Sequence, residues 1–289
     1  MLAAMARGAA ELSTMEVHDT RRGAASHDWP TVASLAVLAY AAANVLHEGL
    51  GHGGACLLVG GAPQLLTTAN FECGTDGLLP AASRLIAASG TIANLIGGAA
   101  AVIAYRRSDA RGPAVRFFLW LFATINGFTA FGYFLFSGVG GIGDWADVMA
   151  AVHPQWVWRP PLAAAGFALY WLAAQRAFAA LGRFIGGRPS DRFIVGRRMA
   201  VLSYVSGGLL YCLAGALNPS GPRLLLISAA GASLGGTSGL WWGTNFLRAT
   251  APQGIAAGPI GIARDARLVA AAAAAALVFV CVLGPGITL

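Results

Sequence analysis

The stretch TVASLAVLAYAAANVLHEGLGHGGACLLV, residues 31–59, decides the fold class of this chain. It is almost wholly apolar and longer than the roughly 20 residues that an α-helix needs to cross the hydrocarbon layer of a membrane. The exception is HEGLGH (47–52), which carries His47, Glu48 and His52 into or beside that layer. Ionisable side chains there are costly and indicate a functional site. Two imidazoles and a carboxylate so close together indicate a transition-metal site with an acid/base group beside it.

The composition of the whole chain points to the same environment. Of the 289 residues, 57% are hydrophobic and 11% charged, and the mean hydropathy is +0.65. Soluble domains carry about 25% charged residues, so we predict an all-α polytopic membrane protein. Apolar runs of spanning length lie at 31–59, 84–105, 114–136, 158–181, 199–217, 224–246 and 268–283. They predict about seven transmembrane helices, with six or eight as alternatives, because the last run is short and 224–246 is rich in Gly and Ser.

The distribution of arginine predicts the orientation, since the chain contains no lysine. With the N-terminus in the cytoplasm, 16 of the 19 basic residues fall on the cytoplasmic side and only Arg84, Arg159 and Arg223 on the other. This bias is the positive-inside signal. It accounts for the net charge of +7 with anionic lipid headgroups as counter-charge, so no nucleic-acid partner is needed. We expect an integral protein of a bacterial plasma membrane with a cytoplasmic tail at residues 1–30.

The four cysteines do not have the spacing of a metal site. Cys56 and Cys73 fall on the outer side and can pair in an oxidising compartment. Cys212 and Cys281 lie within predicted helices, as is typical of small apolar packing residues.

The spacing of the two histidines does not fit a regular α-helix. Zinc proteases typically have H-E-x-x-H, in which the histidines are four apart and the Glu is the general base. Here they are five apart, which at about 100° per residue separates His47 and His52 by about 140°. A π-bulge favoured by Gly49 and Gly51 would return both to one face and leave Glu48 as the base. Alternatively, Glu48 and His52 are the ligands and His47 supports them; we favour the first reading.

A third protein ligand is needed, because catalytic zinc typically has three plus water. The candidate is Asp144 in SGVGGIGDWAD (137–147), with Asp147 as the weaker competitor. An unbroken helix from residue 114 to this point would be about 45 Å long, more than the bilayer core. The glycines at 138, 140, 141 and 143 are therefore expected to break it and turn Asp144 back toward the membrane. The alternative is an outer-loop aspartate among interfacial tryptophans.

With these residues in place, the chain resembles the site-2 protease family of intramembrane zinc metalloproteases. HEGLGHGGACLLVGG (47–61) is similar to the histidine helix of that family, and ASGTIANLIGG (88–98) to its small-Gly-x-x-x-Asn element. INGFTAFGYFLFSGVGGIGDW (125–145) occupies the place of the segment that ends in the aspartate ligand. The resemblance covers residues 31–150 and implies a three-helix metalloprotease-like core there. It also implies an orientation of the histidine helix opposite to the one that the arginines predict.

The resemblance implies a role for each candidate residue. His47, His52 and Asp144 would bind Zn²⁺, and Glu48 would activate the water. Asn94 and Asn126 would hold the substrate backbone or the oxyanion, with interhelical hydrogen bonding as the equally weighted alternative. The segment 63–72 would form short strands that can add an edge to an extended substrate, or it is an ordinary loop.

We therefore expect an intramembrane zinc metallopeptidase that hydrolyses peptide bonds of membrane-protein or peptide substrates. The alternative is a non-catalytic metal-binding membrane protein, such as a transporter or chaperone, on the same core. The two separate on Glu48, which only a hydrolase needs. Residues 151–289 carry no ionisable constellation and are expected to be a scaffold or a partner surface; the oligomeric state stays open.

Overall fold

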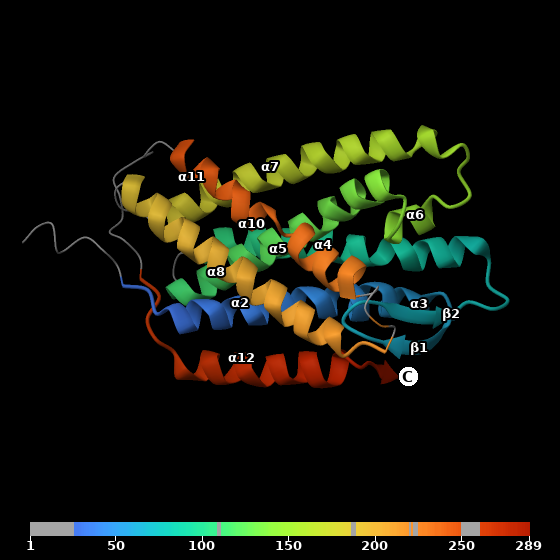
Figure 1. Ribbon diagram of the computed structural model, residues 1–289, viewed down its shortest axis with the longest axis horizontal. Helices are drawn as coiled ribbons and strands as arrows, with labels where there is room; N and C mark the ends of the chain where they lie inside the picture. The colour runs from blue at the N-terminus through green and yellow to red at the C-terminus, as the bar shows by residue number, and fades with distance from the viewer. Residues whose placement is uncertain (1–25, 109–110, 186–188, 220, 222–224, 250–260) are drawn as a thin grey trace, which may run out of the picture.

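The computed structural model describes residues 26–108, 111–185, 189–219, 221, 225–249 and 261–289. It is a bundle in which most helices run along one axis, with a small sheet at one end (Figure 1). The predicted tail at 1–30 lies outside the described residues as far as residue 25. Its last residues lead directly into the first helix.

That first helix is continuous over 30 residues but changes its winding on the way. It consists of α2 (Trp29–Asn44), the π-helix η1 (Val45–Gly53) and α3 (Gly54–Leu58). Asp28 caps it, because its Oδ1 accepts hydrogen bonds from Thr31 N at 3.0 Å and Thr31 Oγ1 at 2.6 Å. Pro30 in the first turn suits a helix start, since the missing N–H has no partner there in any case.

Five helices of the described residues are long and apolar enough to cross a membrane. They are Trp29–Leu58, α4 (Pro80–Arg106), α5 (Pro113–Gly140), Arg192–Ala216 within α8 (Pro189–Ala216), and Ala266–Leu283, which joins α12 (Ala266–Val278) to η5 (Phe279–Leu283). The all-α membrane class is therefore supported.

The predicted number of seven spans is not reached in the described residues. The run at 158–181 forms α7 (Arg159–Ile185), which is long but carries Arg159, Arg176 and Arg183 and is not among the five. The run at 224–246 is not one helix. It is divided into η3 (Leu225–Gly235), α10 (Gly239–Trp242) and η4 (Gly243–Asn245), and α11 (Phe246–Ala249) follows. Its Gly and Ser residues weaken a regular helix, so a span of even winding does not form.

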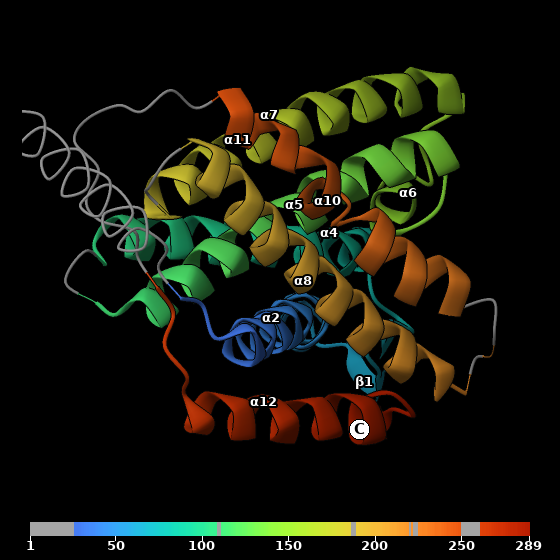
Figure 2. The same cartoon turned by 60° about the vertical axis from the view of Figure 1, so that its left-hand side comes forward.

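The first helix, α4 and α5 pack against one another and carry the candidate site. Close packing depends on small residues: a Cβ on Gly98 of α4 would lie only 3.3 Å from Cβ of Asn126 on α5. The second half joins the same hydrophobic core, in which Phe128 of α5 stacks on Tyr170 of α7 at 4.6 Å. Turned by 60°, the view shows α12 lying along α2 on the far side from α7 (Figure 2).

Residues 62–74 form a β-hairpin. Strands β1 (Ala62–Leu66) and β2 (Phe71–Gly74) pair antiparallel, with Leu66 opposite Phe71. The opposite edge of β1 pairs with β3 (Ile287–Thr288), so the sheet order is β2-β1-β3. From the sequence, residues 63–72 were expected to form either short strands or an ordinary loop. The structure shows two strands.

Cys56 and Cys73, whose pairing the sequence left open, form a disulfide that ties α3 to β2 across a Cα–Cα distance of 6.0 Å. Cys212 and Cys281 are free and lie in helices, as expected.

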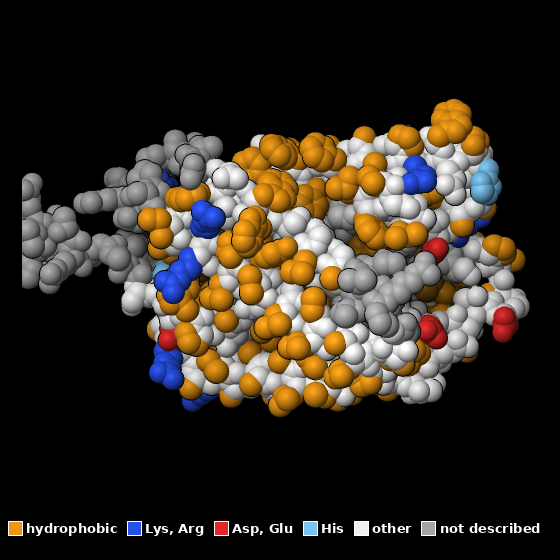
Figure 3. All heavy atoms as spheres, viewed as in Figure 1, with side chains coloured by type: hydrophobic (Ala, Val, Ile, Leu, Met, Phe, Trp, Pro, Cys, Tyr) orange, Lys and Arg blue, Asp and Glu red, His pale blue; other side chains and the backbone are white. Residues whose placement is uncertain are grey.

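Charge is distributed unevenly along the bundle. On the face shown in Figure 3, hydrophobic side chains cover the middle, and arginine side chains lie mostly at the end where α12 begins, with some near the other end. Acidic side chains lie mostly at the opposite end, which carries the hairpin and α6 (Asp144–Val148). An apolar belt between charged ends is what a protein in a bilayer presents.

Candidate metal centre

The π-helix η1 brings the two histidines together. Its wider turn spaces residues i and i+5 on one face, and Nε2 of His47 lies 3.2 Å from Nε2 of His52. Both side chains are buried, and their rings meet edge to face with centroids 4.8 Å apart. This is the π-helical geometry that we favoured from the sequence, in which His47 and His52 share a face, over the alternative in which Glu48 and His52 are the ligands.

Asp144 reaches the histidines because α5 ends where the glycines predicted. Gly141 ends the helix with φ +67°, and Gly143 has φ +86°, both positions where a side chain would be strained. The short helix α6 then begins at Asp144, whose Oδ2 lies 3.3 Å from His47 Nε2 and 3.5 Å from His52 Nε2. His47, His52 and Asp144 form the one group of potential metal ligands found among the described residues.

Asp147, the predicted competitor, is not part of this group. Its side chain is exposed, one turn along α6 from Asp144. Partial desolvation and the neighbouring charge of Asp144 both raise the pKa of Asp147 above its ordinary value.

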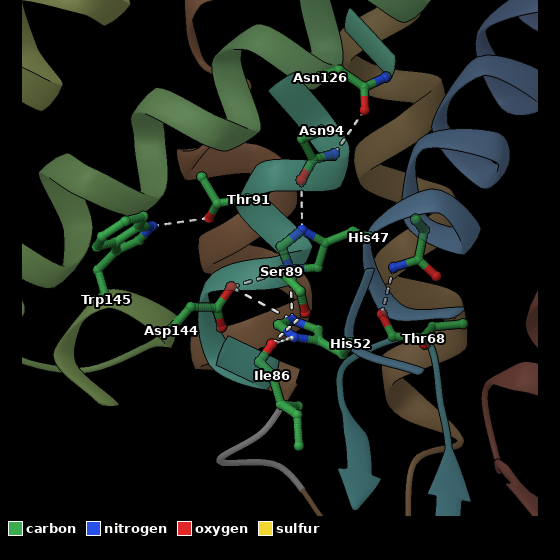
Figure 4. Close-up of polar contacts among 11 residues, drawn as sticks. His47, His52, Thr68, Ile86, Ser89, Thr91, Asn94, Asn126, Asp144 and Trp145 are labelled. Atoms are coloured by element: carbon green, nitrogen blue, oxygen red, sulfur yellow. Dashed lines mark hydrogen bonds and ion pairs between the residues drawn. The ribbon is translucent and has the colours of Figure 1, made fainter. Parts of the chain in front are cut away.

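Neighbouring contacts fix α6 against α4. Trp145, next to the aspartate, donates from Nε1 to Thr91 Oγ1 at 3.0 Å, and its ring meets Phe134 edge to face (Figure 4). Arg159 donates to the carbonyl oxygens of Gly138 and Val139 at the end of α5. The turn that presents Asp144 is thus held on both sides.

A chain of amides sets the protonation of His47. Phe122 O can only accept, and it takes a hydrogen bond from Asn126 Nδ2 at 2.8 Å. Asn126 Oδ1 then accepts from Asn94 Nδ2 at 2.7 Å, which leaves Asn94 Oδ1 facing His47 Nδ1 at 2.5 Å (Figure 4). His47 therefore carries its proton on Nδ1, since it faces an acceptor there.

The same holds for His52, whose Nδ1 lies 2.7 Å from the carbonyl oxygen of Ile86. Both Nε2 atoms accordingly present lone pairs to the point that Asp144 Oδ2 also faces. Three electron-rich atoms converge in a buried place, so a positive charge must compensate them.

The spacing of the three atoms favours a metal over a shared proton. Charge-assisted hydrogen bonds are about 2.7–2.9 Å long, shorter than the 3.2, 3.3 and 3.5 Å found here. Zinc with ligands at about 2.0–2.1 Å in tetrahedral geometry places any two ligand atoms about 3.3–3.4 Å apart. The three residues therefore fit a metal ion of this kind.

Glu48 lies beside this centre with one unpaired oxygen. It is buried, and its Oε2 has no hydrogen-bond partner among the described residues. It lines, together with His47, a cavity of about 30 Å³, which is room for about one water molecule. A buried carboxylate oxygen beside such a space is suited to hold water.

A larger cavity of about 830 Å³ reaches Asp144 from the other side. Its wall is apolar and includes Phe136, Phe167, Trp171 and Trp242. Phe136 is 38%, Phe167 60% and Trp171 42% exposed, so this wall continues onto the apolar belt.

Asn94 and Asn126 are fully buried and engaged in the amide chain. The interhelical hydrogen bond that the sequence kept as an alternative is present, and it orients His47. Their predicted role in substrate binding stays a prediction.

Sequence reasoning missed two residues of the site. Gly90 lies within the 88–98 motif, and its small size was the one signal in the sequence that another element packs closely on it. Tyr133, whose ring stacks on His47 at 5.0 Å, lies seven residues after Asn126 and so on the same helix face, a weaker signal.

Gly90→Ala should disrupt the metal centre. A Cβ on Gly90 would lie 2.5 Å from His52 Nε2 and 2.6 Å from His47 Cε1, so at least one imidazole must move. We expect zinc affinity to fall at least about tenfold, as when an outer hydrogen-bond partner of a ligand is lost. Zinc titration of the purified variants measures it.

Gly54→Ala is the matched control, because a Cβ there meets nothing within 4 Å and the change should leave zinc bound. Wild-type zinc affinity in Gly90→Ala would mean that the imidazoles do not lie where the structure places them.

No protein-family model, curated protein or solved structure matches this chain.

Proposed function

We propose that this chain is an intramembrane zinc metallopeptidase related to the site-2 proteases, which hydrolyses peptide bonds of membrane-protein substrates. The observation that carries the proposal is the convergence of His47, His52 and Asp144 on one point with the unpaired carboxylate of Glu48 beside it. Two of the three sequence motifs that resemble the family, 47–61 and 125–145, supply these residues, and the third, 88–98, supplies Asn94 beside them.

The residues divide the chemistry between them. Zinc at this centre would polarise the substrate carbonyl and lower the pKa of water. Glu48 takes a proton from the water while the water oxygen forms a bond to the carbonyl carbon of the substrate. The C–N bond then breaks, and Glu48 returns that proton to the leaving amine. Asn94 holds His47 in the required tautomer throughout.

The larger cavity is consistent with a substrate that arrives from the membrane. It is lined by aromatic side chains, extends to Asp144, and continues onto the apolar belt. An apolar peptide segment is favoured in such an apolar cavity, because its side chains stay out of contact with water. We therefore expect the scissile bond to lie within or next to a transmembrane segment.

We further propose that the metal centre lies toward the outer face of a bacterial plasma membrane. The arginine-rich end of the bundle is opposite the end with the hairpin (Figure 3). The Cys56–Cys73 disulfide lies at the hairpin end, and disulfides persist in oxidising compartments. Two independent features therefore agree on the orientation.

Cysteine labelling in intact cells should confirm this orientation. In a background with Cys212→Ser and Cys281→Ser, Asp76→Cys beside the hairpin should react with an impermeant maleimide. Arg107→Cys at the other end should react only after lysis; both positions are exposed in the structure. The reverse pattern would contradict the positive-inside assignment and favour the orientation that the family resemblance implies.

The proposed activity is tested by incubating membranes of the expression host with the purified wild type or with Glu48→Gln. Mass spectrometry of peptide N-termini should find new termini only with the wild type. If neither protein, loaded with zinc, produces new termini from these membranes or from synthetic transmembrane peptides, the proposed hydrolysis is wrong.

A further inference from the structure

Tyr133 of α5 lies flat on His47. The two ring planes are inclined by only 12°, with centroids 5.0 Å apart. His47 is itself held by Asn94 on its Nδ1 side. The tyrosine ring is therefore fixed next to a proposed zinc ligand.

Tyr133 also separates the two cavities of the site. It is one of three residues, with Thr129 and Ala232, that line both the 30 Å³ cavity at Glu48 and the 830 Å³ cavity at Asp144. A substrate carbonyl attacked by water from the small cavity and held in the large one must lie at this boundary.

The hydroxyl of Tyr133 is unusual within the protein. The structure describes all six tyrosines, and five of their hydroxyls form hydrogen bonds: those of Tyr40, Tyr105, Tyr170, Tyr204 and Tyr211. Within the described part of the chain, the Tyr133 hydroxyl has no such partner. Tyrosine hydroxyls away from bulk water usually find one, so a partner from outside the chain is indicated.

We propose that the Tyr133 hydroxyl donates a hydrogen bond to the carbonyl oxygen of the attacked peptide bond as that oxygen gains negative charge; this rests on the proposed peptidase function. A donor that is already in place where charge develops stabilises the transition state without reorganisation. The stack on His47 supplies that fixed position. Asn94 and Asn126 already donate, to Asn126 Oδ1 and Phe122 O respectively, whereas the Tyr133 hydroxyl, held by the stack on His47, is still free to donate.

Binding of acetohydroxamate to the cobalt-substituted protein tests this assignment without any substrate. Cobalt gives a visible absorption band that shifts when the anionic hydroxamate oxygen joins the metal. Tyr133→Phe keeps the ring and its stack and removes only the hydroxyl. Cobalt binding should be unchanged, whereas acetohydroxamate should bind at least about tenfold more weakly, the lower end of the cost of losing a hydrogen bond to a charged group.

Tyr204→Phe is the control. Tyr204 lines neither cavity, and its hydroxyl donates a hydrogen bond to Leu234 O at 3.1 Å. Equal acetohydroxamate affinity in wild type and Tyr133→Phe would overturn the donor role while leaving the peptidase proposal intact. Loss of cobalt from Tyr133→Phe alone would overturn it as well, because the residue would then support His47 instead. Failure of the wild type to bind cobalt would overturn both proposals.

Discussion

Glu48→Gln should abolish peptide cleavage and leave the zinc in place. Glutamine has nearly the same volume, so the buried position beside His47 stays filled, but its amide cannot accept a proton from water. General-base catalysis contributes about 10²–10⁴-fold, and we expect the rate at which new peptide N-termini form to fall by that factor. Zinc content should stay at the wild-type value, as measured by elemental analysis of the same preparation.

Glu72→Gln is the matched control, since Glu72 lies exposed on β2 and lines neither cavity of the site. Equal cleavage by wild type and Glu48→Gln would exclude the hydrolase mechanism and leave the non-catalytic metal-binding alternative. Loss of zinc from Glu48→Gln would show instead that Glu48 is a ligand, as the second reading of the HEGLGH spacing has it.

Asp144→Ala should remove most of the zinc. The aspartate is the one anionic group in the ligand set, and without it two neutral imidazoles hold the ion. Loss of an outer hydrogen-bond partner costs about 10- to 100-fold in metal affinity, so we expect loss of a ligand to exceed about 100-fold. A competition titration with a zinc-binding dye measures the affinity.

Asp147→Ala provides the control for this change. Asp147 lies three residues after Asp144 on the same short helix, and its carboxylate is not part of the group that could hold a metal. The zinc affinity of this variant should equal that of the wild type. If Asp147→Ala loses zinc and Asp144→Ala keeps it, the third ligand is wrongly assigned.

The site could be predicted where local geometry determines it. Five residues separate His47 from His52, and a π-helical turn is the local change that reconciles that spacing with a shared face. The glycines before Asp144 likewise had to end α5, because a longer helix would exceed the thickness of the hydrocarbon core of the bilayer. Both predictions concern a single segment and need no knowledge of its neighbours.

The features that sequence could not supply depend on contacts between distant segments. Asn94 becomes a support for His47 only because Asn126, on another helix, fixes the direction of its amide. Gly90 matters because η1 packs on it, and the pairing of β1 with β3 joins residues more than 200 positions apart. The seven predicted spans are not confirmed in the described residues for a related reason. Counting apolar runs cannot show that the 224–246 segment divides into short helices of different winding.

The measurement that tests the central claim most directly is zinc K-edge X-ray absorption of the purified wild type, together with its metal content. We predict one zinc per chain, coordinated by two imidazole nitrogens and by oxygen at about 2.0–2.2 Å, with no sulfur ligand. Two histidines and one carboxylate also suit ferrous iron, so the identity of the metal is part of the result. Iron at the site, a sulfur ligand near 2.3 Å, or a protein that takes up no metal would contradict the proposed metallopeptidase centre.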